Sequence, residues 1–312
     1  MGGRYGLCRW ATMTIASMEN PARIVIDIDG PSAVFGMCDA SSKLIANSVR
    51  TYRTDDFATA TDCIQNFSRE TGTRLAQSDC AISVSGAISG DGIRIQRCKW
   101  IISRSGLGYL FQKPVFFLND SAAKLWASKE VGPMSHRPLG SVLQPDFTTA
   151  GKWLGINYES GLGAAILIRD EDGNFVHVET EAGHCAFAPV SSDETALHAE
   201  LAKQKRPVSW ERALFCEGTT TQQRSAILGS FVGDTIMATG SWSGVLLFGT
   251  AADLLANAEN AAAFASRRAA RANFQIPLKN IPCWTVRMPN INLVGLARYL
   301  SMKSNVPKLV AA

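Results

Sequence analysis

Patterns that mark several protein classes are absent from this sequence. No run of five or more Lys/Arg residues occurs and the net charge is only +4, so nothing indicates a nucleic-acid or polybasic membrane surface. No apolar stretch, the one at 244–249 included, approaches the roughly 20 residues that span a bilayer. Eight cysteines are scattered without a Cys-x-x-Cys pair, so spacing predicts neither a zinc site nor a disulfide framework. We expect no nucleic-acid partner, no membrane partner and a reducing, cytoplasmic location.

The bulk composition is that of an ordinary globular chain. With 312 residues, 46% of them hydrophobic and 19% charged, the chain is large enough for one large domain or two medium ones. Residues 1–20 contain Arg4 and Arg9 and no acid before Glu19, a bias shared with targeting peptides. Polar residues break their apolar run and no small-residue cleavage pattern follows, which favours a disordered leader or an upstream translation start.

The first half of the chain reads as a mixed α/β unit. Residues 23–30 are a β-branched run that ends in a turn and residues 33–39 read as a second strand, which predicts a hairpin, and 43–50 is a candidate third strand. Apolar spacing predicts a helix over 55–71, with Asp55 or Asp56 as N-cap and Gly72 after its end. Strands at 79–84 and 115–118 and a helix over 121–129 complete the unit.

The same order of elements recurs after a Gly/Pro-rich stretch at 131–145. Strands are predicted at 153–157, 163–169 and 175–179, with turns at 160–163 and at Asp172-Gly173. A helix over 222–239 ends at Gly240, a strand follows at 245–248, and a last helix covers 292–302. The pattern predicts two hairpin-led α/β halves.

Three polar motifs stand out against this framework. Asn119-Asp120 follows a strand end, where open α/β sheets place ligand chemistry, although a helix N-cap is the simpler interpretation. Glu181 and His184 flank small residues that let a ligand approach the backbone, although a lone histidine is more often structural. Glu211 lies early in a predicted helix, where an acid normally interacts with the helix dipole. Taken together, these side chains offer the donors and acceptors that a polyhydroxylated ring requires.

The chain resembles the non-ROK bacterial glucokinases, sugar kinases of the actin-like fold, from about residue 23 to residue 302. The segments that carry the resemblance are Leu118-Asn119-Asp120, Glu181-Ala-Gly-His-Cys-Ala-Phe187 against E-G-G-H-x-x-F, Ser209-Trp-Glu-Arg-Ala213 against S-x-E-R-x, Gly229-Ser-Phe-Val-Gly-Asp234 and Trp242-Ser-Gly-Val245. The zinc-binding cysteine cluster of the ROK sugar kinases is absent from this sequence.

The resemblance implies an α/β fold in which two actin-like (RNase H-like) domains with mixed sheets flank a central cleft. Residues 21–126 with 291–312 would form the smaller domain and 127–290 the larger one. It also implies phosphorylation of glucose at its 6-hydroxyl by ATP with Mg²⁺, in a cytoplasmic homodimer whose partners are a small-molecule sugar and ATP. Asp120 would be the general base. The hexose hydroxyls would be held by Asn119, Asp120, Glu181, His184 and Glu211.

On the nucleotide side the sequence departs from the family. The first phosphate hairpin, D-x-G-G-T in the family, is here 27–31, where Asp29 adds a negative charge and Pro31 removes a hydroxyl and a backbone donor. The second loop, G-T-G-L-G, begins here with Glu159, and the adenosine loop keeps only its first glycine. The positions carried over for ATP are Asp27, Gly30, Ser160, Gly161, Gly163 and Gly249, with Asp27 also implied for the metal.

These departures leave three interpretations open. The chain is an ATP-dependent hexose kinase; or it is a catalytically weak or inactive relative that keeps the hexose pocket as a sensor; or it is a kinase acting on another sugar, sugar acid or amino sugar. Neither G-x-x-x-x-G-K-[ST] nor G-x-G-x-x-G occurs, so the sequence offers no alternative phosphate loop.

Overall fold

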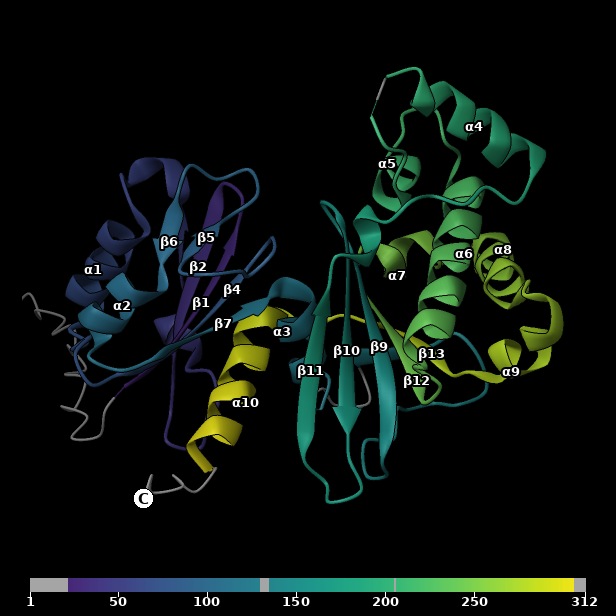
Figure 1. The fold of residues 1–312 in the computed structure, drawn as a ribbon. Helices are drawn as coiled ribbons and strands as arrows, with labels where there is room; N and C mark the ends of the chain where they lie inside the picture. The colour runs from purple at the N-terminus through teal and green to yellow at the C-terminus, as the bar shows by residue number, and fades with distance from the viewer. Residues whose placement is uncertain (1–21, 130–134, 205, 306–312) are drawn as a thin grey trace, which may run out of the picture.

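The computed structural model describes residues 22–129, 135–204 and 206–305, and it contains two large mixed sheets side by side (Figure 1). The first sheet has the order β3-β2-β1-β4-β7. Its strands are β1 Arg23–Asp29, β2 Ser32–Cys38, β3 Arg50–Arg53, β4 Asp79–Val84 and β7 Val115–Asn119. β1, β2 and β3 pair antiparallel, whereas β1, β4 and β7 pair parallel.

The second sheet repeats this plan, in the order β11-β10-β9-β12-β13-β8. Its strands are β8 His136–Pro138, β9 Gly151–Tyr158, β10 Leu162–Arg169, β11 Phe175–Thr180, β12 Gly244–Gly249 and β13 Cys283–Val286. Antiparallel hairpins join β9, β10 and β11, whereas β12 pairs parallel with β9 and β13 pairs parallel with β12. A short ribbon of β5 Gly92–Arg94 and β6 Ile101–Ser103 stands apart from both sheets.

Helices cover the sheets and lie between them (Figure 1). They are α1 Ala60–Thr71, α2 Arg104–Phe111, α3 Asp120–Ala127, α4 Ser192–Ala202, α5 Trp210–Leu214, α6 Thr221–Thr239, α7 Ala251–Leu254, α8 Ala258–Ala269, α9 Gln275–Asn280 and α10 Ile291–Asn305. Within the described ranges, none of them is both long and apolar enough to cross a membrane.

One hydrophobic core joins the two halves of the molecule. Val25 and Leu118 of the first sheet, Trp126 of α3, and Trp153 and Leu246 of the second sheet pack in a single cluster. The C-terminal helix α10 packs on α3 so tightly that a Cβ at position 295 would lie 1.7 Å from the carbonyl oxygen of residue 123. α3 and α10 therefore form the shared layer that holds β7, and the residues at its end, against the second sheet.

Most predicted elements are confirmed, with two corrections. Both predicted hairpins form, and Gly72 and Gly240 end their helices with φ of +66° and +67°. The third strand is β3, not 43–50. The first helix begins at Ala60 rather than at residue 55, because Thr59 accepts the Asp62 N–H and the Asp62 carboxylate accepts the Thr59 N–H, a reciprocal cap that outcompetes the aspartates upstream.

The predicted domain boundaries stay a prediction, because α3 packs against α10 and also against strands β9 and β10 of the second sheet. The predicted leader at 1–20, together with 21, 130–134 and 306–312, lies outside the described residues.

Candidate active site

Two adjoining cavities lie between the sheets, and Asp120 lines both. The larger, of about 630 Å³, is lined by Asp27 and Asp29 from the first sheet and by Glu159 and Gly249 from the second. The smaller, of about 50 Å³, is lined by all the residues predicted to hold a sugar: Asn119, Asp120, Glu181, His184 and Glu211. The structure therefore brings the three polar motifs together, and it puts Asp120 where the contents of the two cavities meet.

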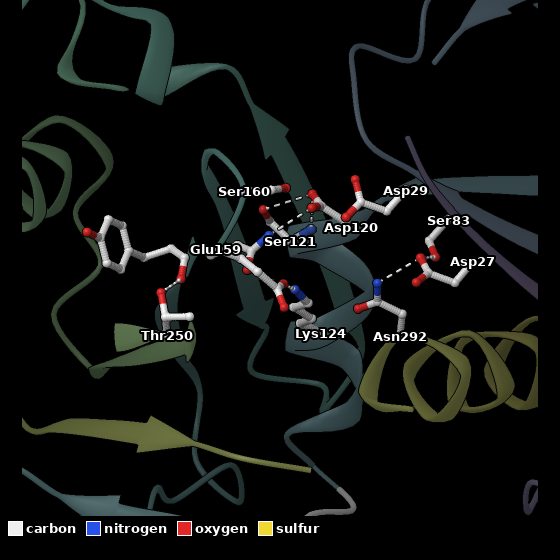
Figure 2. Close-up of polar contacts among 12 residues, drawn as sticks. Asp27, Asp29, Ser83, Asp120, Ser121, Lys124, Glu159, Ser160, Thr250 and Asn292 are labelled. Carbon is white, nitrogen blue, oxygen red and sulfur yellow. Dashed lines mark hydrogen bonds and ion pairs between the residues drawn. The ribbon is translucent and has the colours of Figure 1, made fainter. Parts of the chain in front are cut away.

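Asp120 is the first residue of α3, directly after β7 (Figure 2). Its Oδ1 accepts the Ser121 N–H at 2.7 Å and its Oδ2 accepts from Asn157 Nδ2 at 2.8 Å. Burial raises the pKa of Asp120; the charge of Lys124 lowers it and that of Asp29 raises it further. These hydrogen bonds hold the carboxylate in one orientation, and its raised pKa increases its affinity for a proton.

Asn119 is a helix N-cap, the simpler of the two interpretations of the Asn119-Asp120 motif, and it also lines the smaller cavity. Its Oδ1 accepts the Ala122 N–H at 2.8 Å, which makes it the N-cap of α3. Its backbone N–H donates to Glu179 Oε1 at 2.6 Å. Glu179, on β11, was not predicted from the sequence; alternation along a strand gave no sign that its carboxylate turns toward the end of β7.

Glu181, His184 and Glu211 converge from a short turn and from α5. His184 Nε2 lies 3.7 Å from Glu181 Oε2, and its Nδ1 lies 3.9 Å from Glu211 Oε1. Glu211 Oε2 also accepts the Leu162 N–H at 2.8 Å, which fixes α5 against the start of β10. Burial raises the pKa of Glu181, with His184 lowering it and the carboxylates of Asp120 and Glu211 raising it.

Glycine is required in this region because the backbones approach closely. A Cβ at position 183 would lie 1.9 Å from the Leu162 carbonyl oxygen, and one at Gly163 would lie 2.2 Å from Ser121 Oγ. A Cβ at Gly161 would come within 2.9 Å of Glu211 Oε2. The small residues of both motifs therefore let the turn, β10 and α3 meet around the smaller cavity.

The predicted nucleotide-binding positions divide between the two cavities. Gly249, with φ of +71°, lines the larger cavity with Asp27, whereas Ser160, Gly161 and Gly163 line the smaller one with the residues predicted to hold a sugar. Gly30 forms the β1–β2 turn with φ of +54° and belongs to the lining of neither.

Asp27 lies on β1 with its Oδ1 engaged twice (Figure 2). Ser83 Oγ donates to it at 2.5 Å and Asn292 Nδ2 of α10 donates at 2.7 Å. Burial raises the pKa of Asp27 to about 6, although both hydrogen bonds and the charge of Lys124 lower it. Asn292 Oδ1 is buried without a hydrogen-bond partner in the same cavity lining.

These oxygens fit a hydrated magnesium ion. Mg²⁺ prefers oxygen ligands and usually binds through one or two carboxylates, several waters and substrate phosphates rather than through an all-protein cage. Asp27 and the unpartnered Asn292 Oδ1 provide that kind of donor set. In keeping with it, no group of three or more His, Cys, Asp or Glu side chains within the described ranges is arranged to hold a metal alone.

Asp29 and Glu159 are the carboxylates that distinguish the two phosphate loops of this chain from those of the family. Each is paired with a cation. Arg97 Nη2 donates to Asp29 Oδ1 at 3.1 Å and to Ser160 Oγ at 2.5 Å, so it crosses from one sheet's loops to the other's. Lys124 Nζ lies 2.6 Å from Glu159 Oε2. Neither cation was predicted as a site residue; for Lys124 the available signal was its spacing of four from Asp120, which puts both on one face of a helix.

Comparisons with known proteins identify the family of this chain. The family model Glucokinase matches residues 24–223 and 216–303. A glucokinase from Xylella fastidiosa (strain M23) is 24% identical over 333 aligned residues, which cover 93% of this chain and 98% of the relative.

Solved structures show the same fold. A Balamuthia mandrillaris glucokinase in complex with glucose superposes with a TM-score of 0.72 at 16% identity, over 91% of this chain and 94% of the other. A ROK family glucokinase from Streptomyces griseus, in complex with glucose and AMPPNP, superposes with a TM-score of 0.56 at 15% identity, over 89% of this chain and 98% of the other. The predicted α/β fold of two actin-like domains with mixed sheets around a cleft is confirmed, and the chain belongs to the glucokinase family of sugar-phosphorylating enzymes.

Proposed function

We propose that this protein transfers the γ-phosphoryl group of ATP to the 6-hydroxyl of glucose, with Asp120 as general base. The observation that carries the proposal is that Asp120 lines both cavities, the smaller with the predicted sugar ligands and the larger with Asp27, the predicted metal ligand, and with Gly249. Phosphoryl transfer depends mostly on positioning and charge stabilisation, so a carboxylate at this junction meets its main requirement.

The sugar is held by Asn119, Glu181, His184 and Glu211 in this proposal. Their side chains present carboxylate, amide and imidazole groups to the smaller cavity, which suits a ring of hydroxyls that both donate and accept. A buried polar group left unpaired costs about 1–3 kcal/mol, so each missing or inverted hydroxyl would lower affinity by roughly that amount.

Asp120 accepts the proton of the attacking hydroxyl. Its oxygens are oriented by Ser121 and Asn157, and burial raises its pKa toward the range in which a carboxylate is an effective base. Asp27 and Asn292 would hold Mg²⁺, which supplies charge neutralisation of the phosphates when it is bound.

The smaller cavity must widen before a hexose can enter. A volume of about 50 Å³ accommodates a few water molecules but not a six-membered ring with its hydroxyls. The contact from Arg97 to Ser160 bridges the loops of the two sheets beside this cavity. We infer that this contact opens for sugar entry and that closure over the sugar excludes water from the transfer step.

The test is a coupled ADP-release assay over a panel of hexoses, comparing the wild type with Asp120→Asn. We expect glucose-dependent ADP release in the wild type and a loss of turnover of roughly 10²- to 10⁴-fold in the variant, with glucose affinity by calorimetry much less affected. Asp172→Asn, in the exposed β10–β11 turn, is the matched control and is expected to behave as the wild type.

An Asp120→Asn enzyme that keeps half of the wild-type turnover would refute the assignment of the base. Glucose binding without ADP release from any sugar would instead favour the second candidate, a hexose-binding relative that lacks catalysis. The carboxylates of Asp29 and Glu159 beside the phosphate loops are the observation that keeps this second candidate under consideration.

A further inference from the structure

Lys124 is a buried ammonium at the edge of the larger cavity. It lies one turn after Asp120 on α3, its residue is only 5% exposed, and it is part of the cavity lining (Figure 2). Its Nζ donates to Asn157 Oδ1 at 2.8 Å and to Glu159 Oε2 at 2.6 Å. Taking an ammonium group out of water costs several kcal/mol, so a lysine retained at such a position requires compensation.

Glu159 compensates the charge of Lys124 only from a partly exposed position. The side chain of Glu159 is 48% exposed, whereas that of Lys124 is 7% exposed, so the lysine is the member of the pair that the fold fixes in place. An exposed carboxylate can turn into solvent at little cost, which would leave the Lys124 ammonium facing the cavity.

The charge of the cavity explains what such an ammonium is suited to bind. Asp27, Asp29, Asp120 and Glu159 contribute four carboxylates to the lining, and Lys124 is the buried basic residue among them. Arg287, the other basic residue of this lining, is largely exposed and pairs with Asp253. A triphosphate entering this cavity therefore meets one fixed protein cation, which is Lys124.

The hydrogen bonds connect this cation to the predicted base. Asn157 accepts from Lys124 through Oδ1 and donates to Asp120 through Nδ2 at 2.8 Å, so one amide group joins the two side chains. A phosphoryl group bound by Lys124 is consequently held beside Asp120, between the two cavities.

We propose that Lys124 binds the triphosphate of the nucleotide, with Glu159 as the partner that it exchanges for phosphate. This inference rests on the proposed function for the identity of the nucleotide. It assigns to a side chain of α3 part of the phosphate contact that Pro31 and Asp29 remove from the β1–β2 turn.

The experiment measures binding of inorganic tripolyphosphate and of Mg·ATP by calorimetry to four proteins: the wild type, Lys124→Met, Glu159→Gln and the double variant. We expect Lys124→Met to weaken tripolyphosphate binding by at least about tenfold, the factor that one charge-assisted hydrogen bond represents. Glu159→Gln should strengthen it, and the double variant should bind at least about tenfold more weakly than Glu159→Gln alone.

The double variant separates this inference from a purely structural ion pair. If Lys124 only neutralises Glu159, the double variant will bind tripolyphosphate as tightly as Glu159→Gln does, and the proposal fails. It fails equally if the wild type does not bind tripolyphosphate. Should Lys124→Met alone fail to fold, the double variant, which removes both members of the Lys124–Glu159 pair, still provides the comparison, and Lys124→Arg should retain most of the affinity.

Lys113→Met is the matched control, because Lys113 pairs with Asp79 at 2.9 Å and lines neither cavity. The outcome is also independent of turnover. A wild type that turns over ATP while Lys124→Met binds phosphate normally overturns this inference alone, whereas Lys124-dependent phosphate binding without any ADP release overturns the proposed function alone.

Discussion

Replacing Asp27 by asparagine tests whether the ionised carboxylate of Asp27 lowers the free energy of unfolding of the protein. The pKa of Asp27 is raised from 3.8 to about 6, because burial disfavours its charged form more than the hydrogen bonds from Ser83 and Asn292 favour it. Asparagine retains an oxygen that can accept both hydrogen bonds but carries no charge. The substitution therefore isolates the cost of ionisation.

The sign and size of the effect follow from the two pKa values. Below pH 3.8 the carboxyl is protonated in the folded and the unfolded chain, so it contributes no pH dependence. Between 3.8 and about 6 the unfolded chain releases the proton first, so the free energy of unfolding falls as pH rises. At 1.36 kcal/mol per pH unit, the full cost above pH 6 is about 3 kcal/mol.

Thermal unfolding of the metal-free wild type and Asp27→Asn, followed by tryptophan fluorescence from pH 4 to pH 8, measures this difference. We expect similar Tm values at pH 4 and a variant more stable by up to about 3 kcal/mol at pH 7.5, or roughly 6–12 °C for a cooperative unit of 150–250 residues. Loss of Mg·ATP binding should accompany the gain, since the same change removes the predicted metal ligand.

The control is Asp39→Asn, because the pKa of Asp39 is shifted in the opposite direction from that of Asp27. Hydrogen bonds from the Ser41 hydroxyl and the Lys43 backbone lower the pKa of this partly exposed aspartate, so its contribution to stability is present at neutral pH and lost as pH falls. A wild type that is as stable as Asp27→Asn at pH 7.5, or more stable, would show that Asp27 is not ionised at a cost and would refute the reasoning.

Two further predictions concern the two sides of the cleft. Glu181→Ala should abolish glucose binding measured by calorimetry while leaving Tm near that of the wild type, because Glu181 contacts His184 at the edge of the smaller cavity rather than the core; an unchanged affinity would remove it from the sugar site. Asp29→Gly with Pro31→Thr should raise Mg·ATP affinity about tenfold, because it removes a carboxylate beside the triphosphate and restores a backbone donor. If titration shows no change, the β1–β2 turn does not face phosphate.

Local elements were predictable where the determinants are close in sequence. The hairpin of β1 and β2 follows from a β-branched run that ends in a turn before a second strand, and the ends of α1 and α6 follow from Gly72 and Gly240, whose left-handed conformations glycine adopts without a Cβ clash. Even the missed start of α1 had a local signal, because Thr59 and Asp62 have the spacing of a capping box.

The residues predicted to hold the sugar could be grouped from the sequence for a different reason. Asn119-Asp120, Glu181 to His184 and Glu211 were joined by family resemblance, and the structure puts all five of the predicted sugar residues on one cavity. Ser160, which the resemblance carries over for the nucleotide, lines that same cavity, because β10 and α3 pack closely there.

By itself, the sequence determined most strands of the two hairpins, the C-terminal ends of α1 and α6 and the chemical types gathered at the site, since these depend on neighbours a few residues apart. Only the tertiary structure decided how the charges pair. Lys124 and Glu159 are 35 positions apart, and Arg97 and Asp29 are 68 apart. Whether an added carboxylate repels phosphate or is held by a cation depends on separations of a few ångströms, because Coulomb energy falls with distance and burial weakens its screening by water. For Lys124 and Glu159, that separation arises when α3 packs between the two sheets.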